Sequence, residues 1–273
     1  MIKVQDSVGN EVPLKVLTFA GGEQHVQLPE RRVFGPGVFH LTAHLHNAAD
    51  IMTLLLVTDA IRRKYGADVP ITLLCPYLPY ARQDRVCADG EALSVAVMCN
   101  LLNAQNYELI ALWDTHSDVA PALLNSVLVV PQRELVLRYI EHLPMPKVAV
   151  VAPDAGAAKK AFDLARYLKV PFIQGLKHRN VTTGVISGTT IEPTPVPDQT
   201  ALLVVDDICD GGRTFIELSK VLADSHLRCT QHLYVTHGIF SRGLEPLLKH
   251  YKTVLCPNVW PGIPENPRLI RLS

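Results

Sequence analysis

The sequence predicts an α/β fold in which two similar halves each build a parallel sheet covered by helices. One pattern recurs along the 273-residue chain: a short apolar run, a polar or glycine-containing loop, and then a helical segment. The apolar runs are nearly continuous, which is typical of parallel strands that are buried on both faces. These units are too many for one small sheet. We therefore expect two domains, residues 1–144 and 145–273, which meet at the proline-containing stretch 141–147.

The first half contains the first predicted strands and helices. Apolar runs predict strands over 37–45, 71–75 and 108–113, and helical patterns cover 47–66 and 91–104. Asn47 is the predicted N-cap of the first helix, because an Asn side chain accepts a hydrogen bond from a backbone N–H of the first turn. Gly66 is the predicted stop of that helix.

The second half continues the alternation. The run 147–156 is predicted as a strand that passes into a loop. Residues 157–168 are predicted as a helix, because their apolar side chains repeat at i, i+3, i+4 and i+7. A second helix is predicted after Thr214. Further strands are predicted over 201–205, 231–238 and 253–257.

Composition and charge exclude several classes of function. Acidic and basic residues balance at 26 each, so no broad positive field indicates a nucleic-acid partner. The sequence shows no Lys/Arg run, no signal segment and no apolar run of spanning length, so we expect no membrane partner. The six cysteines are scattered without a CxxC pair. That pattern favours reduced thiols in a cytoplasmic protein over disulfides or a zinc site.

Polar segments follow the predicted strands, and ligands of open α/β sheets bind beyond the carboxyl ends of strands. The segments are PYLPYARQDR (76–85), WDTHSD (113–118), APDAG (152–156), LKHRN (176–180) and VDDICDGGRT (205–214). The last of them contains two glycines between a strand and a helix. Glycines there let backbone N–H groups approach an anion at the positive end of the helix.

The segment 205–214 has the chemistry of a sugar-phosphate site. Its phosphate-binding part is Gly211, Gly212, Arg213 and Thr214. Asp206 and Asp207 repel a phosphate, but they accept hydrogen bonds from vicinal hydroxyls such as those of a ribose, or help to hold a cation. A capped helix with solvated acids is the alternative interpretation. It needs only one Asp, whereas this segment has a third in Asp210.

The motifs resemble those of one family along nearly the whole chain. LLVVDDICDGGRTF (202–215) resembles the phosphoribosyl diphosphate (PRPP) loop, which type I phosphoribosyltransferases and ribose-phosphate diphosphokinases share. PYLPYARQDR, VAPDAGAAKKA (151–161) and VTHGIFS (235–241) resemble the second of these families, the PRPP synthetases, in order and spacing. FAGGEQHVQLP (19–29), WDTHSDVAPALLN (113–125) and LKHRN resemble it more loosely.

The resemblance implies a fold, cofactors and partners. It implies two similar phosphoribosyltransferase-type, Rossmann-like parallel-sheet domains, with the ATP-binding segments in the first domain. The second domain would carry the ribose-phosphate loop and the catalytic loop. It further implies ATP as co-substrate, Mg²⁺ as cofactor, small-molecule substrates and a homo-oligomer, either a dimer or larger.

The resemblance also assigns roles to residues. The ATP-binding residues would be Phe19, Glu23, Arg82, Gln83, Asp84 and His116, and the Mg²⁺ ligands His116 and Asp154. The catalytic residues would be Lys177 and Arg179. The acceptor would be bound by Asp206, Asp207, Asp210, Gly211, Gly212, Arg213 and Thr214. Phe19 and Glu23 would belong to an adenine-site segment that reaches a neighbouring subunit.

The implied reaction transfers the β,γ-diphosphate of ATP to the anomeric hydroxyl of a ribose phosphate and releases AMP. Arg213 departs from the family's loop, which usually has no cation there. Its guanidinium either points to solvent, pairs with Asp210, or meets extra negative charge on the acceptor. The last case would fit ADP-ribose, so ribose 5-phosphate is only slightly favoured as the acceptor. Two further functions stay open: a type I phosphoribosyltransferase and a non-catalytic PRPP-synthetase-like binding protein.

Overall fold

The computed structural model describes residues 1–29, 37–140, 147–179 and 186–271. Contacts divide the chain into two units, Met1–Val130 and Pro131–Ser273. The predicted boundary at residues 144 and 145 lies outside the described residues and stays a prediction. The helix before it, α4 (Gln132–Ile140), packs on α5 and β12 of the second unit. The contacts of α4 therefore assign the segment after Val130 to the second unit.

Unit 1 is built on a sheet that is parallel except at one edge. Within the described residues, the strand order is β1 (Ile2–Gln5), β4 (Phe39–Ala43), β5 (Ile71–Cys75), β6 (Leu109–Trp113) and β7 (Val127–Val130). β1 runs antiparallel to β4, and the other neighbours are parallel. Their carboxyl ends therefore lie at the same edge of the sheet.

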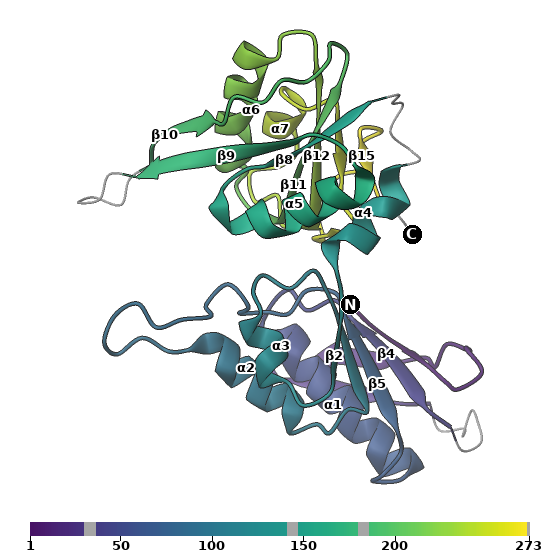
Figure 1. Cartoon of the computed structure of the whole chain (residues 1–273). Helices are drawn as coiled ribbons and strands as arrows, with labels where there is room; N and C mark the ends of the chain where they lie inside the picture. The colour runs from purple at the N-terminus through teal and green to yellow at the C-terminus, as the bar shows by residue number, and fades with distance from the viewer. Residues whose placement is uncertain (30–36, 141–146, 180–185, 272–273) are drawn as a thin grey trace. The chain divides into compact units, whose positions relative to one another are not determined.

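The helices of unit 1 are α1 (Ala48–Tyr65), α2 (Ser94–Asn103) and α3 (Val119–Leu123). The prediction for α1 is confirmed at both ends. The Asn47 side chain accepts a hydrogen bond from the Asp50 backbone N–H, and the Gly66 N–H donates to the Arg62 carbonyl. Leu54, Val57 and Ile61 of α1 are fully buried in the core with the sheet. Figure 1 shows α1, α2 and α3 together in this unit.

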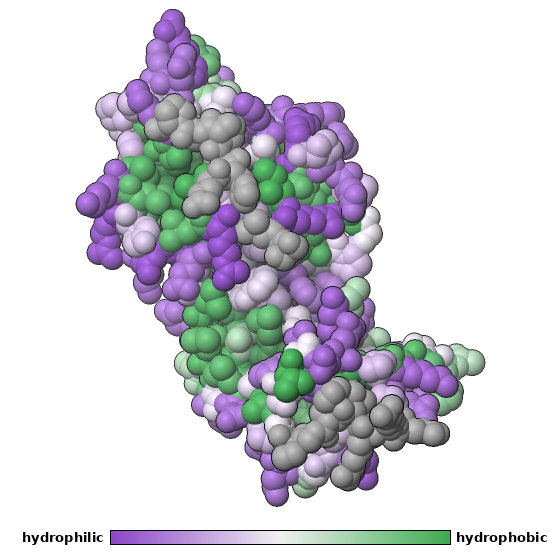
Figure 2. Space-filling model, turned by 90° about the vertical axis from the view of Figure 1, so that its right-hand side faces the viewer, coloured by the Kyte–Doolittle hydropathy of each residue, from purple (hydrophilic) through white to green (hydrophobic). Residues whose placement is uncertain are grey.

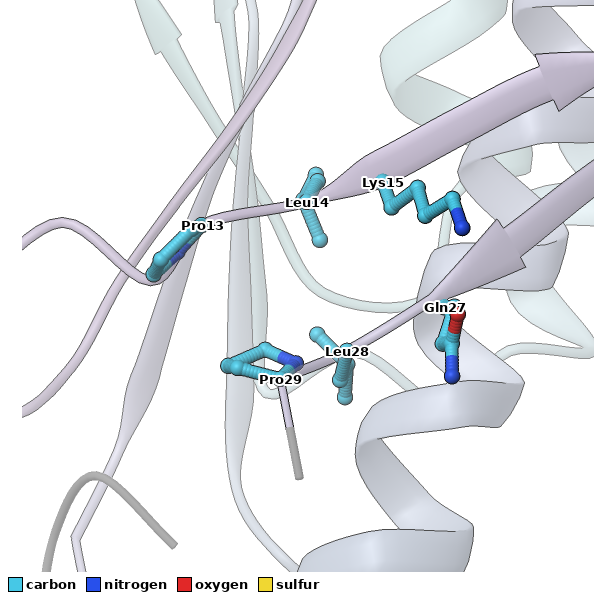
Figure 3. Close-up of a pocket in the computed structure, with 6 residues that line it drawn as sticks. All are labelled: Pro13, Leu14, Lys15, Gln27, Leu28 and Pro29. Atoms are coloured by element: carbon cyan, nitrogen blue, oxygen red, sulfur yellow. The ribbon is translucent and has the colours of Figure 1, made fainter. Parts of the chain in front are cut away.

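A separate hairpin, β2 (Lys15–Thr18) and β3 (Gln24–Gln27), packs on α1. The end of the hairpin away from its turn forms a pocket of about 310 Å³. Its lining residues are Pro13, Leu14, Lys15, Gln27, Leu28 and Pro29, as Figure 3 shows. Lys15 and Gln27 are paired across the two strands. The pocket therefore lies at the opposite end of the hairpin from Phe19 and Glu23.

Unit 2 has a larger sheet. In the part of the chain that the structure describes, its order is β10 (Ile186–Ile191), β9 (Phe172–Arg179), β8 (Val148–Ala152), β11 (Ala201–Cys209), β12 (Thr230–Gly238), β13 (Thr253–Leu255) and β15 (Leu269–Ile270). A short strand, β14 (Asn258–Val259), pairs with the end of β12. β9 and β10 are antiparallel, and the other pairs are parallel. Figure 1 shows the β9–β10 hairpin extending beyond the rest of the sheet.

The helices of unit 2 besides α4 are α5 (Ala155–Leu168), α6 (Arg213–Ser225) and α7 (Glu245–Leu248). Apolar side chains such as Leu202, Val204 and Leu233, at the centre of the sheet, have no solvent exposure. Phe215, Leu218 and Leu222 of α6 belong to the same core, as the apolar spacing of that helix predicts. The fold is therefore α/β with parallel-sheet domains, as predicted.

Two features of unit 2 differ from the sequence prediction. The predicted strand 201–205 continues to Cys209, because β12 stays paired with it in register as far as Gly238. The β9–β10 hairpin was not predicted, because its polar and glycine residues lack a continuous apolar run. Both differences lengthen strands at the edge where the candidate site lies.

The outer surface is mixed in character. Hydrophilic side chains cover much of the face in Figure 2, with apolar patches between them. Among the described residues, no helix has the length and apolar character that crossing a membrane requires.

Candidate functional site

In unit 1, two of the predicted ATP-binding segments follow neighbouring strands. Arg82, Gln83 and Asp84 lie in the loop after β5, and His116 lies in the loop after β6. The two loops meet at their start, where the Trp113 N–H donates to the Pro76 carbonyl at 3.0 Å. Since β5 and β6 are parallel neighbours, both segments lie at the carboxyl edge of the same sheet. Arg82, Gln83 and His116 are exposed there.

Phe19 and Glu23 lie at the turn of the β2–β3 hairpin. The Phe19 N–H donates to the Glu23 carbonyl at 2.8 Å, and the Gly22 N–H donates back to the Phe19 carbonyl. Gly22 has a φ of 92°, which explains a glycine at that turn. The Phe19 ring is about half exposed and tilted against His25. The hairpin thus presents an aromatic ring and a carboxylate at one exposed tip.

In unit 2, Asp154 and Lys177 form an ion pair. Asp154 follows β8, and its Oδ1 atom accepts hydrogen bonds from the N–H groups of Gly156 and Ala157 at the start of α5. Its other oxygen, Oδ2, lies 2.5 Å from the Lys177 Nζ on β9. Both side chains are largely shielded from solvent. The Arg179 side chain lies outside the described residues.

The approach of β9 to the end of β8 depends on Gly175. A Cβ atom at this position would lie 2.6 Å from the Ala152 carbonyl oxygen and 2.7 Å from that of Pro153. Those two residues directly precede Asp154. The missing side chain therefore lets β9 pass close to β8, two residues before it presents Lys177 to the carboxylate.

Asp206 and Asp207 lie inside β11, next to these groups. The Asp207 N–H donates to the Asp206 Oδ1 atom at 2.8 Å. Burial, followed by the charge and hydrogen bond of Asp207 and then the charge of Asp154, raises the pKa of Asp206 well above its ordinary value. The Asp206 carboxyl is thus close enough to both other carboxyl groups to be influenced by them, which favours a bound cation or hydroxyl donors.

The predicted phosphate loop leads directly into α6. Gly212 is the N-cap residue of α6, with a φ of 75°, and leaves the first N–H groups of the helix without a side-chain cap. A Cβ atom on Gly212 would lie 3.0 Å from the Leu247 side chain, so the loop packs closely against α7. Uncapped N–H groups at a helix start are suited to bind anions.

The Arg213 guanidinium pairs with an acid on its own helix. Its Nε atom lies 2.7 Å from the Glu217 Oε1 atom, one turn further along α6. The sequence left three alternatives for this guanidinium, namely solvent, Asp210 and the acceptor, and the side chain is 66% exposed to solvent. Asp210 instead accepts a hydrogen bond from the Ser241 hydroxyl at 2.6 Å. The Glu217 partner removes the reason to expect that Arg213 supplies a cation to the acceptor.

Three residues near the site were not predicted from the sequence: Gly175, Ser241 and Arg242. The role of Gly175 is visible only from its packing against the end of β8, and the sequence does not show that packing. Ser241 lies in the VTHGIFS motif, so the motif pointed to it without a role. Arg242 is separated from the loop in sequence and reaches it only through the fold.

The predicted metal ligands belong to different units, His116 to unit 1 and Asp154 to unit 2. Among the residues with described positions, no group of three or more His, Cys, Asp or Glu side chains forms a metal site. Asp154 nevertheless fits a cation chemically, because its Oδ2 atom, which does not cap the helix, already faces the Lys177 ammonium. Carboxylate oxygens are the protein ligands that Mg²⁺ prefers.

Comparisons with known proteins match both halves of the chain to domains of one family. Residues 3–105 match the N-terminal domain of ribose phosphate pyrophosphokinase, and residues 132–267 match the phosphoribosyl transferase domain. The chain is 32% identical over 241 residues to a Thermococcus kodakarensis protein named ribose-phosphate pyrophosphokinase, covering 84% of this chain and 79% of that protein. A Gloeobacter violaceus protein of the same name is 31% identical over 268 residues, covering 96% and 79%.

A solved structure has the same fold. The crystal structure of phosphoribosylpyrophosphate synthetase from Mycobacterium smegmatis superposes with a TM-score of 0.81 and covers 98% of this chain and 88% of that one. The two sequences are 22% identical. The similarity therefore shows the fold, while the more similar sequences show the family.

Proposed function

Because the chain belongs to the ribose-phosphate pyrophosphokinase family, we propose that it transfers the β,γ-diphosphate of ATP to ribose 5-phosphate. The observation that carries the proposal is the edge of unit 2. There a glycine loop at a helix start, an acid pair on β11 and the Asp154–Lys177 pair lie together. The glycine loop supports binding of a phosphate, and the acid pair supports hydrogen bonds to ribose hydroxyls. The Asp154–Lys177 pair supports stabilisation of the phosphoryl group that is transferred.

The proposed step is an in-line displacement at the β-phosphorus of ATP. The anomeric oxygen of ribose 5-phosphate forms a bond to the β-phosphorus, and the bond between that phosphorus and the oxygen bridging to the α-phosphate breaks. AMP leaves with the bridging oxygen, and the hydroxyl proton is released. Such chemistry needs positioning and charge stabilisation more than covalent help.

The residues of this chain have distinct roles in the proposal. Asp206 and Asp207 accept hydrogen bonds from the ribose hydroxyls and so orient the anomeric oxygen. Backbone N–H groups of Gly211 and Gly212 bind the 5-phosphate. Lys177, with Arg179, neutralises charge that develops on the transferred group. Arg82, Gln83, Asp84 and His116 bind ATP from unit 1.

Mg²⁺ is the proposed cofactor, with Asp154 and His116 as the residues that would hold it. The fit rests on the Oδ2 atom of Asp154, which faces a cationic group, the Lys177 ammonium, in the structure. When bound, the ion would supply positive charge that stabilises the phosphates of ATP. Asp154 keeps its Oδ1 atom on the helix start in either case, so the carboxylate is held in a fixed orientation.

Ribose 5-phosphate is the acceptor that the comparisons support. The relatives are named as ribose-phosphate pyrophosphokinases, and none of these names supports ADP-ribose. The structural reason to consider ADP-ribose was a cation at residue 213, and that guanidinium is paired with Glu217. In this proposal the backbone of the loop binds the 5-phosphate without a contribution from Arg213.

Two competing functions explain less of the chain. A type I phosphoribosyltransferase would need only the second unit, whereas residues 3–105 match a pyrophosphokinase domain. A non-catalytic binding protein would be expected to lack the metal His or the loop Lys. Both His116 and Lys177 are present, and Lys177 lies against Asp154.

The assay combines the purified protein with Mg²⁺, ATP and either ribose 5-phosphate or ADP-ribose, and follows AMP by chromatography. We expect AMP in equal amount to the acceptor 1-diphosphate when ribose 5-phosphate is present. If no AMP is released with either acceptor, the proposal is contradicted. If AMP is released only with ADP-ribose, then ADP-ribose and not ribose 5-phosphate is the acceptor.

A homo-oligomer and a location in the cytoplasm belong to the same proposal. The resemblance places Phe19 and Glu23 at the adenine site of a neighbouring subunit, and both lie exposed at a hairpin tip. Light scattering after size-exclusion chromatography should give a mass of at least twice that of the 30.1 kDa chain. A monomer at working concentration contradicts this part.

A further inference from the structure

The turn after β12 is fastened to the start of the phosphate loop. The N–H groups of Ile239 and Phe240 donate to the Cys209 carbonyl at 2.9 and 3.1 Å. The Ser241 N–H donates to the Asp210 carbonyl at 3.2 Å, and its hydroxyl donates to the Asp210 carboxylate. These four hydrogen bonds fix the position of the next residue, Arg242, relative to the loop.

The Arg242 side chain passes over Gly211. A Cβ atom placed on Gly211 would lie 3.5 Å from the Arg242 Nε atom and 3.7 Å from its Cδ atom. The space that a larger residue would fill at position 211 is therefore next to the side chain of Arg242. Its guanidinium lies close to the backbone from which the N–H groups of the loop are presented.

The charge of the Arg242 guanidinium is available to a ligand. Its side chain is exposed, and no hydrogen bond or ion pair links its guanidinium to another residue of known position in the structure. Arg213, the neighbouring cation at the loop, is held by Glu217. The cation that the sequence suggested at residue 213 is thus supplied from a different segment of the fold.

We propose that Arg242 binds the 5-phosphate of the acceptor and makes the protein select a phosphorylated pentose over an unphosphorylated one. The inference rests on the proposed function, since it assigns a specificity residue to the same acceptor site. A guanidinium presents several N–H donors in one plane and matches phosphate oxygens bidentately. Together with the N–H groups of Gly211 and Gly212, it contacts the phosphate from a second side.

The experiment measures acceptor binding directly, by calorimetric titration with ribose 5-phosphate and with inorganic phosphate in the absence of ATP. For Arg242→Gln we expect affinity for both to fall about tenfold, the effect of losing a charged hydrogen bond. Arg242→Lys should restore part of it. The KM for ribose 5-phosphate should rise in parallel, while the KM for ATP stays within about twofold.

Arg268→Gln is the matched control. This exposed Arg precedes β15, so it lies at the amino edge of the same sheet, opposite the phosphate loop. It should leave the affinity unchanged. Unchanged affinity in Arg242→Gln, an equal loss in Arg268→Gln, or the loss appearing in Arg213→Gln instead would each overturn the inference.

The design separates this inference from the proposed function. If wild-type protein binds ribose 5-phosphate but forms no AMP, the reaction is wrong while the assignment of Arg242 is still decided by the titration. If the KM for ATP rises as much as that for the acceptor, Arg242 serves the nucleotide and the inference is wrong. Thermal melts of each variant check that this exposed substitution leaves the fold intact.

Discussion

At the scale of single residues, Asp154 has two separate duties. One carboxylate oxygen caps α5, and the other faces the Lys177 ammonium. A metal ion held by the second oxygen would share it with the ammonium, so the proposed function makes the ion and Lys177 alternative partners of this atom. If Lys177 has the role proposed for it, cation binding and the position of its ammonium would be linked.

Lys177→Met should raise metal affinity and lower turnover. Without the ammonium, Mn²⁺ has no competitor for the Asp154 carboxylate. The affinity of the protein for Mn²⁺ in the absence of nucleotide should therefore rise by about fivefold or less, which corresponds to the free energy of a partly exposed ion pair. The turnover number should fall by about a hundredfold, because developing phosphoryl charge loses a cation. Paramagnetic resonance of free Mn²⁺ measures the first and AMP release the second.

Lys220→Met, on the exposed face of α6, is the control for general charge effects. It should change neither quantity. A Lys177→Met protein that binds Mn²⁺ no better than wild type would show that the ammonium does not occupy the cation's place.

Asp206 predicts a pH dependence of stability. Because its pKa is raised in the folded state, folding is favoured by this group below its ordinary pKa, and that contribution is lost as the pH rises through the raised value. Asp206→Asn removes the buried charge. The free energy of unfolding should therefore rise relative to wild type by about 1 kcal/mol at pH 8 and change little near pH 4. Urea unfolding at both pH values measures the difference.

An equal effect of Asp206→Asn at the two pH values would contradict the raised pKa. Binding of ribose 5-phosphate should weaken in the same variant, because an amide accepts the ribose hydroxyls less well than a carboxylate. Stability and binding thus move in opposite directions at this position.

At the scale of elements, the contact between β8 and β9 depends on the absence of a side chain. Gly175→Ala would push a Cβ atom into the carbonyls of Ala152 and Pro153. Overpacking of this kind costs about 1–3 kcal/mol, so the melting temperature should fall. The turnover number should fall with it, because Lys177 shifts relative to Asp154, while the KM for ribose 5-phosphate changes little.

The same hairpin offers the control. A Cβ atom on Gly188 in β10 would meet nothing within 4 Å, so Gly188→Ala should leave both the melting temperature and the turnover number nearly unchanged. If the two variants behave alike, the close approach at Gly175 does not position the site.

The elements also show where sequence reasoning succeeds. The strand β5 was predicted from its continuous apolar run, and the helix α1 from its capping residues. Both signals act locally along the chain. The extension of β11 depends on its pairing with β12, and the β9–β10 hairpin depends on pairing between two polar segments. Pairing between strands leaves little trace in one strand's composition.

For the site, motif residues were predicted and fold-dependent neighbours were not. Asp154, Lys177 and Asp206 come together as the motifs imply, because parallel strands share one carboxyl edge. The partner of Arg213 and the position of Arg242 depend on side-chain packing around the loop. Neither follows from the spacing of residues along the chain.

At the scale of the whole molecule, the proposed function assigns the two substrates to different units. Arg82 belongs to unit 1, and the phosphate loop belongs to unit 2. Arg82→Ala should raise the KM for ATP by about tenfold, through loss of a charged hydrogen bond to the nucleotide. The affinity for ribose 5-phosphate, titrated without ATP, should stay within about twofold of wild type. A comparable loss of acceptor affinity would contradict the division.

The turn that carries Ser241 and Arg242 has an evolutionary consequence. The loop joins β11 to α6, so the positions of its backbone N–H groups are fixed by those two elements. The turn after β12 brings the side chain of Arg242 to the loop, and the residue at that position can be replaced without changing the loop backbone. If Arg242 binds the acceptor phosphate as proposed, replacements at position 242 would change acceptor preference without altering the loop.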